Sequence, residues 1–376
     1  MQQNLRLREW MIEVKVKHHI IPIFVPHVGC PHDCVFCNQK KITGMSTDIT
    51  SKDVDNTIKS YLQTIPKSNQ KLEVAFYGGS FTAIDKDIQR ELLGVASEYK
   101  KKGLIDRIRL STRPDCIDLG VLDLLKESSV DIIELGVQSL NQEVLDKSNR
   151  GHTKEDVYKA VELIRRYDFT LGLQMMLGLP SDDREKSIYT AGELIKLKPD
   201  LVRIYPTLVV KDTYLEKSYE NHEYKALSIQ EAVTTSSIIL MMFELEDINV
   251  IRIGLQPTEN INSESGEVVA GPFHPSFRQF VESKIYGLIL NEFLESNEIV
   301  GQDLKIEINK KEVSNIVGQK SSNVKVIREK YNLRKVSING IDMPKGYFYI
   351  IDDESKHKID RKIYIEKYLK TRNDFS

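Results

Sequence analysis

The sequence has few cysteines and no long apolar run. Only four of its 376 residues are cysteine, and three of these lie close together, which leaves no dispersed, even set for a disulfide framework. No stretch approaches the ~20 apolar residues of a membrane span. The opening residues, MQQNLRLREWMIEVKVKHH, lack both the continuous apolar region and the small-residue cleavage site of a signal peptide. We therefore expect a cytoplasmic protein in a reducing compartment, with no membrane association.

Charge is nearly balanced overall but unevenly distributed along the chain. There are 53 Lys+Arg and 55 Asp+Glu residues. Residues 301–376 hold 17 basic and 11 acidic residues, a net charge of +6, which leaves 36 basic and 44 acidic residues, or −8, for the rest. A basic terminal region joined to an acidic region favours a nucleic-acid partner.

Between residues 19 and 255, short β-rich runs alternate with longer amphipathic stretches. The predicted strands cover residues 20–25, 72–77, 107–111, 131–137, 170–176, 201–205 and 250–253. The predicted helices, with apolar residues at three- and four-residue intervals, cover 85–101, 118–127, 153–167, 182–196 and 228–245. Thr153 and Asp156 form a predicted capping pair. Repeated strand–helix units predict an α/β fold, a partial (β/α)6 barrel whose ligands gather at the C-terminal ends of the strands.

Two domains are expected. The first covers residues 1–300, with a barrel core at about 19–255 and a closing loop and helix over 256–298. Its loop is predicted over the Asn-, Ser-, Glu- and Gly-rich residues 256–272 and its helix over 275–295. The second covers residues 301–376, with strands at 304–308, 335–338 and 347–351 and helices at 311–317, 323–331 and 358–369.

Cys30, Cys34 and Cys37 follow the first predicted strand, and Phe36 precedes the last of them. Three thiolates in one tight loop can hold three corners of a 4Fe-4S cluster and leave the fourth iron open. The spacing resembles the signature of radical S-adenosylmethionine (radical SAM) enzymes. That resemblance implies S-adenosylmethionine bound to the open iron and an electron donor such as ferredoxin or flavodoxin. It also implies that reduction of the cluster cleaves the cofactor to a 5′-deoxyadenosyl radical.

A second motif, residues 76–82 (FYGGSFT), ends the second predicted strand. Radical SAM enzymes place a glycine pair there, and glycine allows the backbone to approach the cofactor's amino group because it lacks a Cβ. The resemblance thus implies cofactor contacts for Gly78, Gly79 and Ser80. An isolated pair of glycines would otherwise indicate only an ordinary turn.

Five further motifs resemble one branch of the superfamily, the catalytic subunit of Elongator and its relatives, which modify the wobble uridine of transfer RNA. These motifs are residues 111–115 (STRPD), 134–139 (ELGVQS), 151–153 (GHT), 204–210 (IYPTLVV) and 271–275 (GPFHP). The resemblance covers most of residues 19–285. It implies that the cofactor's ribose and methionine lie against Ser111, Arg113, Glu134 and Gln138, and that Gly178 lies beside its adenine. Arg113 and Glu134 could instead form a structural ion pair, and Met175 and Met176 are expected in the barrel core.

This chain departs from the Elongator subunit in two respects. Its cysteine spacing is the narrower one that is common in the superfamily. The residues after His274 show no match to the subunit's acetyltransferase domain. We therefore do not expect the carboxymethylation reaction that uses acetyl-CoA.

The order of elements after residue 300 is similar to that of a KH domain. In that family a Gly-x-x-Gly loop between two helices holds the backbone of about four single-stranded nucleotides. Here the loop is Gly318-Gln319-Lys320-Ser321, with serine in place of the last glycine. The similarity implies RNA contacts from Gly318 and Lys320. A plain helical hairpin on a small α+β domain is the alternative.

The favoured hypothesis is a radical SAM enzyme, a transferase, that modifies a base of transfer or ribosomal RNA. Tyr205 and Gln256 are candidates to face the substrate from strand ends, although either could serve packing alone. A second hypothesis keeps the radical chemistry but assigns it a small metabolite, as in the oxygen-independent coproporphyrinogen oxidases. A third is a structural zinc site, in which His27, His32 or Cys116 joins the three loop cysteines.

Overall fold

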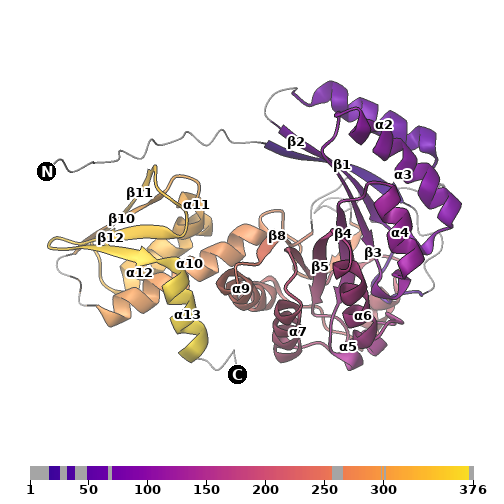
Figure 1. Cartoon of the computed structure of the whole chain (residues 1–376). Coiled ribbons are helices and arrows are strands. Elements are labelled where there is room, and N and C mark those ends of the chain that lie inside the picture. The colour runs from indigo at the N-terminus through magenta and orange to yellow at the C-terminus, as the bar shows by residue number, and fades with distance from the viewer. Residues whose placement is uncertain are drawn as a thin grey trace, which may run out of the picture.

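A curled parallel sheet forms the larger part of the protein (Figure 1). The computed structural model describes residues 17–25, 32–38, 49–66, 70–255, 266–297, 299 and 302–371. The sheet has seven strands in the order β1-β2-β3-β4-β5-β6-β8. They are β1 (Lys17–Val25), β2 (Gln70–Gly78), β3 (Arg107–Thr112), β4 (Ile132–Gln138), β5 (Thr170–Leu177), β6 (Leu201–Pro206) and β8 (Asn249–Ile253). The predicted partial barrel is therefore confirmed.

Helices follow most of these strands along the chain. They are α2 (Ser51–Thr64), α3 (Lys86–Lys101), α4 (Leu119–Glu127), α5 (Gln142–Lys147), α6 (Lys154–Arg165), α7 (Arg184–Lys196), α8 (Tyr214–Glu220) and α9 (Ile229–Leu245). The five predicted helices are present, and Thr153 and Asp156 form the predicted capping box of α6. Helices α2, α5 and α8 were not predicted. Across the described ranges, no helix has both the length and the apolar content needed to cross a membrane.

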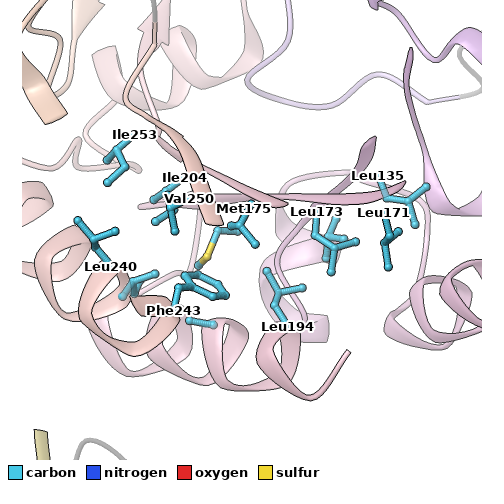
Figure 2. Packing of buried hydrophobic residues seen from close by; sticks show 14 of the residues in the cluster. Leu135, Leu171, Leu173, Met175, Leu194, Ile204, Leu240, Phe243, Val250 and Ile253 are labelled. Atoms are coloured by element: carbon cyan, nitrogen blue, oxygen red, sulfur yellow. The ribbon is translucent and has the colours of Figure 1, made fainter. Parts of the chain in front are cut away.

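The barrel core lies between the outward face of the sheet and its helices. Figure 2 shows Leu173 and Met175 of β5 packed toward Leu194 of α7 and Phe243 of α9. Met175 is fully buried, as predicted, whereas Met176, its neighbour, is half-buried. Successive side chains of a strand point to opposite faces. The outward positions therefore build the apolar core and leave the inward positions for polar groups.

The loop predicted over residues 256–272 is wrong at its C-terminal end, where the structure has a strand. Residues 256–265 lie outside the described part of the chain, but Val268–Ala270 forms strand β9. This strand pairs antiparallel with β7 (Val209–Val210), and both carry small apolar β-branched residues. The pairing satisfies backbone groups that a loop would leave to water.

The C-terminal sheet has four strands in the order β11-β10-β12-β13. Its elements are β10 (Asp303–Asn309), α11 (Val313–Val317), α12 (Ser322–Lys330), β11 (Lys335–Ile341), β12 (Tyr347–Ile351), β13 (Lys356–Asp360) and α13 (Arg361–Thr371). The helix predicted over 358–369 is wrong at its start, because Lys356–Asp360 pairs with β12 and the helix begins only at Arg361. In β13 the inward His357 and Ile359 alternate with lysines, a period-two pattern typical of a strand.

Helix α10 (Phe277–Ser296) joins the two sheets (Figure 1). It packs against α9 on the barrel side and against α11, α12 and α13 on the other. Arg361, only 4% exposed, binds Glu244 of α9 at 2.8 and 3.0 Å and Glu282 of α10 at 2.9 Å. Its guanidinium also lies 4.8 Å from the centre of the Tyr286 ring. The start of α13 is thus fixed to both helices. The expected domain boundary near residue 300 stays a prediction.

We predict that Arg361→Ala lowers the free energy of unfolding by about 3 kcal/mol, because it leaves two partly buried carboxylates without their shared cation. The neighbouring Lys362→Ala is the matched control. Lys362 binds Asp247 at 2.8 Å, but the side chains are 45% and 86% exposed, so its loss should cost no more than about 1 kcal/mol. Urea unfolding of the two variants checks this, and equal midpoints would contradict the proposed docking role of Arg361.

Candidate functional site

The cysteine loop follows β1 at the C-terminal edge of the sheet. Cys34 is buried, Cys37 is half-buried, and the Cys37 amide donates to the Cys34 carbonyl at 3.0 Å, which closes a tight turn. The backbone of Val35 is held on two sides: its amide donates to the Ser148 carbonyl at 3.1 Å and its carbonyl accepts from the Leu215 amide at 2.8 Å. The turn between the two thiols is therefore anchored to the end of α5 and the start of α8.

Several predicted residues of this site lie outside the described part of the chain. They are Cys30 and Gln256, together with His27 of the zinc alternative. Phe36 is described and is half-buried in the loop. Among the described residues, no three His, Cys, Asp or Glu side chains gather as metal ligands. A complete ligand set of the predicted kind requires Cys30.

A buried arginine lies beside the loop. Arg150 Nη1 donates to Cys34 Sγ at 3.3 Å, and Nη2 donates to the Gly136 carbonyl at 2.6 Å. The Arg150 carbonyl in turn accepts from Arg113 Nη2. Positive charge beside the sulfur offsets the negative charge of a thiolate that ligates a metal. Arg150 was not among the predicted site residues, although it directly precedes the Gly151-His152-Thr153 motif.

That motif packs against the cysteine loop. Gly151 has φ = +73°, and a Cβ there would lie 2.3 Å from the ring of His32. The adjacent His152 is buried, and its Nε2 is 3.2 Å from the Val137 carbonyl. The pKa of His152 is lowered to about 3, mainly by burial and further by the charges of Arg150 and Arg113. His152 is therefore neutral at physiological pH, and its ring can donate to Val137.

Gly78 and Gly79 lie where β1 and β2 end side by side. Gly78 has φ = +109°, and a Cβ there would lie 2.4 Å from the Val25 carbonyl oxygen. The same carbonyl accepts from the Gly79 amide at 3.1 Å. Close approach of two backbones thus requires glycine at position 78. Contact with a cofactor stays a prediction for both residues.

Ser80 links the ends of β2 and β3. Its hydroxyl is 2.8 Å from Thr112 Oγ1 and accepts from the Arg113 amide at 3.1 Å. Arg113 is itself buried and donates to Asp115 at 2.9 and 3.0 Å. The alternative ion pair between Arg113 and Glu134 is wrong, because each has other partners.

Glu134 is the centre of a buried network on the inward face of the sheet. It is fully buried, and its carboxylate binds Arg109 of β3 and Arg203 of β6. Gln174 of β5 donates to Glu134 Oε2 at 3.0 Å and lies 3.3 Å from the Ser111 hydroxyl. Burial raises the pKa of Glu134, but the two guanidinium groups outweigh it and hold the pKa below its usual value. Glu134 is therefore an ionised carboxylate.

The same network extends to both sides. Arg109 donates to Glu73 of β2 at 2.6 and 3.0 Å. Arg203 donates to the hydroxyls of Tyr77 at 3.0 Å and Tyr205 at 3.3 Å. The two carboxylates and two guanidinium groups balance in charge. Of the network's residues, Ser111, Glu134 and Tyr205 are the ones predicted as site residues from the sequence. Contact of Glu134 with the cofactor and of Tyr205 with the substrate both stay predictions.

Gln138 ends β4 with an unusual backbone. Its φ is +67°, and the register between β4 and β5 shifts between Gly136 and Gln138. Within the described ranges its buried Oε1 has no hydrogen-bond partner. A buried acceptor without a partner is costly, and such positions are often ones that a ligand completes. Gln138 therefore offers an unsatisfied acceptor at the end of β4.

Gly178, at the end of β5, is held through its peptide groups. Its amide donates to Asp182 Oδ2 at 2.8 Å, and its carbonyl accepts from the Tyr224 hydroxyl at 2.6 Å. Ser187 donates to the same Asp182 oxygen at 2.7 Å. Burial raises the pKa of Asp182 to about 6. The segment expected beside the cofactor's adenine is thus fixed on both sides by side chains that were not predicted from the sequence.

The two residues proposed to contact RNA lie in the C-terminal region. Gly318, Lys320 and Ser321 all have positive φ, of 78°, 51° and 60°. Ser321 thus adopts a left-handed conformation at the position where the KH motif has its last glycine. Lys320 is exposed and Gly318 is buried. Whether this loop contacts RNA, and whether the region is a KH domain, stay predictions.

Comparison with known proteins identifies the family of this partial barrel. The family profile described as the Radical SAM superfamily matches residues 24–190, and that of the Radical_SAM C-terminal domain matches residues 199–286. The chain belongs to the radical SAM superfamily.

Its relatives include an uncharacterized protein of Methanocaldococcus jannaschii, 32% identical over 237 residues, which cover 59% of this chain and 72% of that one. The tRNA uridine(34) acetyltransferase of M. jannaschii is 28% identical over 255 residues, 57% of this chain and 47% of that one. Human Elongator complex protein 3 is 27% identical over 202 residues, 48% of this chain and 37% of that one. The chain is thus homologous to the Elongator protein 3 and tRNA uridine(34) acetyltransferase family, but it spans half or less of these two proteins.

The fold agrees with a solved structure. The archaeal Methanocaldococcus infernus Elp3, with residues 1–46 deleted, superposes with a TM-score of 0.56 at 19% identity, over 72% of this chain and 63% of that one. At this identity the likeness concerns the fold. It supports the curled parallel sheet as the common framework of the two proteins.

The described residues fit the cofactors that membership of the superfamily implies, an iron–sulfur cluster and S-adenosylmethionine. Cys34 and Cys37 present soft thiol ligands of the type that iron–sulfur clusters require. Arg150 supplies a compensating cation at Cys34, and Gln138 supplies an unsatisfied acceptor. All four lie at the same end of the parallel strands. These residues would hold the two cofactors.

We predict that Gly151→Ala impairs cluster incorporation, because the new methyl group would displace His32 and with it the cysteine loop. Gly103→Ala is the matched control: Gly103 has φ = +67°, but a Cβ there meets nothing within 4 Å. Both variants carry the strain of a left-handed residue, about 1–2 kcal/mol. After anaerobic reconstitution, Gly151→Ala should hold less than half the iron of the parent, and Gly103→Ala should hold the full amount. Equal iron contents would contradict the packing argument.

We predict a pH-dependent effect of Asp182→Asn on stability. The pKa of Asp182 rises from 3.8 to about 6 on folding, so its contribution is present below pH 3.8 and is lost as pH rises through about 6. Asparagine keeps an oxygen that accepts from Gly178 but does not ionise. The parent should therefore lose up to about 3 kcal/mol relative to the variant between pH 4 and pH 7. Urea unfolding across this range checks it, and parallel stability curves would contradict it.

Proposed function

We propose that this protein is a radical SAM enzyme that modifies a base of transfer or ribosomal RNA. It would use a 4Fe-4S cluster held by Cys30, Cys34 and Cys37, and S-adenosylmethionine held at the strand ends. The observation that carries the proposal is the anchored thiol loop at the mouth of a barrel homologous to those of tRNA uridine(34) acetyltransferases.

The residues at the C-terminal ends of the barrel strands have separate proposed roles. A bound, reduced cluster would supply the electron for reductive cleavage of S-adenosylmethionine, and so the radical chemistry that abstracts hydrogen from a substrate. Arg150 stabilises the ligating sulfur of Cys34, and Gln138 offers an acceptor to the amino or hydroxyl groups of the cofactor. The Glu134 network below fixes the strands that carry these groups. A ferredoxin or flavodoxin is the proposed electron donor.

Two observations support RNA as the substrate. The homologous proteins named above are a tRNA uridine(34) acetyltransferase and an Elongator subunit, and residues 301–376 carry a net charge of +6. A base can reach a barrel mouth only when it is unpaired or flipped out of its helix. A basic region beside the barrel provides the electrostatic attraction that such a polyanion needs. We do not extend the acetyl-transfer activity of those relatives to this chain, because it spans half or less of their length.

The first test is nucleoside mass spectrometry on transfer and ribosomal RNA purified separately from cells that lack the protein. The cells are complemented with the parent, with Cys34→Ala, or with Cys116→Ala, which removes the cysteine outside the loop. We expect one modified nucleoside to be restored by the parent and by the Cys116 variant but not by the Cys34 variant. Its mass would identify the group that is added.

Two outcomes would contradict the proposal. Identical nucleoside profiles in all strains, in both classes of RNA, would favour a small metabolite as the substrate. Restoration by the Cys34 variant would show that the modification does not depend on the cluster.

A further inference from the structure

One face of the C-terminal sheet carries aromatic and basic side chains. Opposite positions in neighbouring strands place them on the same side: Glu307 pairs with Tyr349, Tyr349 with Lys358, and Asp303 with Lys335. We call this surface the open face; it consists of Lys305, Glu307, Lys335, Tyr347, Tyr349, Lys356 and Lys358. All seven residues are half-buried or exposed.

The other face of the sheet is occupied by the core. Ile306, Ile308, Phe348 and Ile350 are fully buried there, and Phe348 makes an edge-on contact with Tyr286 of α10. In Figure 1, helices α10, α12 and α13 lie on one side of the C-terminal strands. The tyrosines of the open face are therefore not needed to fill the core.

The tyrosines and lysines of the open face are paired in space. Lys356 Nζ lies 4.2 Å from the centre of the Tyr349 ring, and Lys358 Nζ lies 4.6 Å from that of Tyr347. Each half-buried ring therefore has a lysine ammonium group over it. These contacts are weak at exposed sites, about 0.5–1 kcal/mol, so a ligand can replace them.

The open face is positively charged. By register Asp360 also lies on this side, opposite Tyr347. Four lysines therefore stand against two carboxylates, those of Asp360 and of Glu307, which binds Lys305 at 2.6 Å and Lys356 at 2.8 Å. Asp303, at the start of β10, is bound by Arg334 at 2.9 Å and adds no net charge. Accessible aromatic rings within a basic groove or sheet are the features that bind single-stranded nucleic acid, because bases stack on the rings and lysines contact the phosphates.

We propose that the open face binds an unpaired stretch of RNA, with bases stacked on Tyr347 and Tyr349 and phosphates bound by Lys356, Lys358, Lys305 and Lys335. This inference deepens the proposed function and rests on it, because it identifies where the RNA substrate is held. The loop at Gly318, by comparison, offers one lysine and no aromatic ring. Because Arg361 ties α13 to the barrel helices, RNA on the open face is held at a fixed position relative to the barrel.

The test measures binding of a fluorescent single-stranded RNA of about 12 nucleotides to the full-length reconstituted protein, by anisotropy over a range of salt concentrations. Replacing Tyr347 and Tyr349 together by valine keeps β propensity and removes the rings. We expect affinity to fall about five- to 100-fold per ring, whereas the double phenylalanine variant should bind like the parent. Lys356→Gln with Lys358→Gln should reduce the salt slope by about 1.4.

Lys362→Gln with Lys370→Gln on α13 removes the same charge away from the open face and is the matched control. Its affinity and salt slope should stay close to those of the parent. A cooperative urea unfolding transition like that of the parent establishes that each variant is folded.

The inference is overturned if the valine variant binds RNA as tightly as the parent, or if binding depends instead on Lys320 and Gly318. It is also overturned if the tyrosines prove to mediate self-association, so that the valine variant changes only the oligomeric state in sedimentation. Failure of the proposed function looks different, because it leaves nucleoside profiles unchanged whichever variant is supplied.

Discussion

The ion-pair network centred on Glu134 is the interaction on which the arrangement of the site depends. A fully buried carboxylate is strongly destabilising unless its charge is balanced and its oxygens are satisfied. Arg109 and Arg203 meet both conditions, and Glu73, Gln174 and Tyr77 satisfy the remaining groups. The network joins β2, β3, β4, β5 and β6 across the inward face of the sheet. Since these strands cannot shift against one another without breaking it, their C-terminal ends stay in fixed relation.

That fixed relation extends to the thiol loop through a second set of contacts at the strand ends. Ser80 ties β2 to β3, Arg113 binds both Asp115 and the Arg150 carbonyl, and Arg150 reaches Cys34. These contacts connect the sheet to the sulfur of Cys34, and no flexible surface side chain takes part in the connection. Another buried arginine, Arg361, fixes the C-terminal region to α9 and α10. Precise placement of a reactive cofactor relative to a large substrate requires this kind of rigidity.

The sequence was sufficient to predict the framework and to name candidate residues at the strand ends. Periodicity located all seven strands of the barrel, because a parallel strand buried on both faces reads as a short continuous apolar run. It did not predict α2, because only Val54 and Ile58 of that helix are buried. It also did not predict β13, because the two lysines of that strand resemble the polar side of a helix. Motif spacing predicted Cys34 and Cys37 as candidate site residues but not Arg150, whose contact with Cys34 joins residues 116 positions apart. Charge alone suggests Arg113 and Glu134 as partners, and only the side-chain contacts of the folded protein show that Arg109 is the residue that reaches Glu134.

The most direct test of the proposed radical chemistry is anaerobic reductive cleavage of S-adenosylmethionine by the reconstituted protein, measured as 5′-deoxyadenosine formed per cluster. We expect 5′-deoxyadenosine and methionine from the parent and from Cys116→Ala, and none from Cys34→Ala. A parent protein that holds a full complement of iron and sulfide yet forms no 5′-deoxyadenosine with a strong chemical reductant would contradict it.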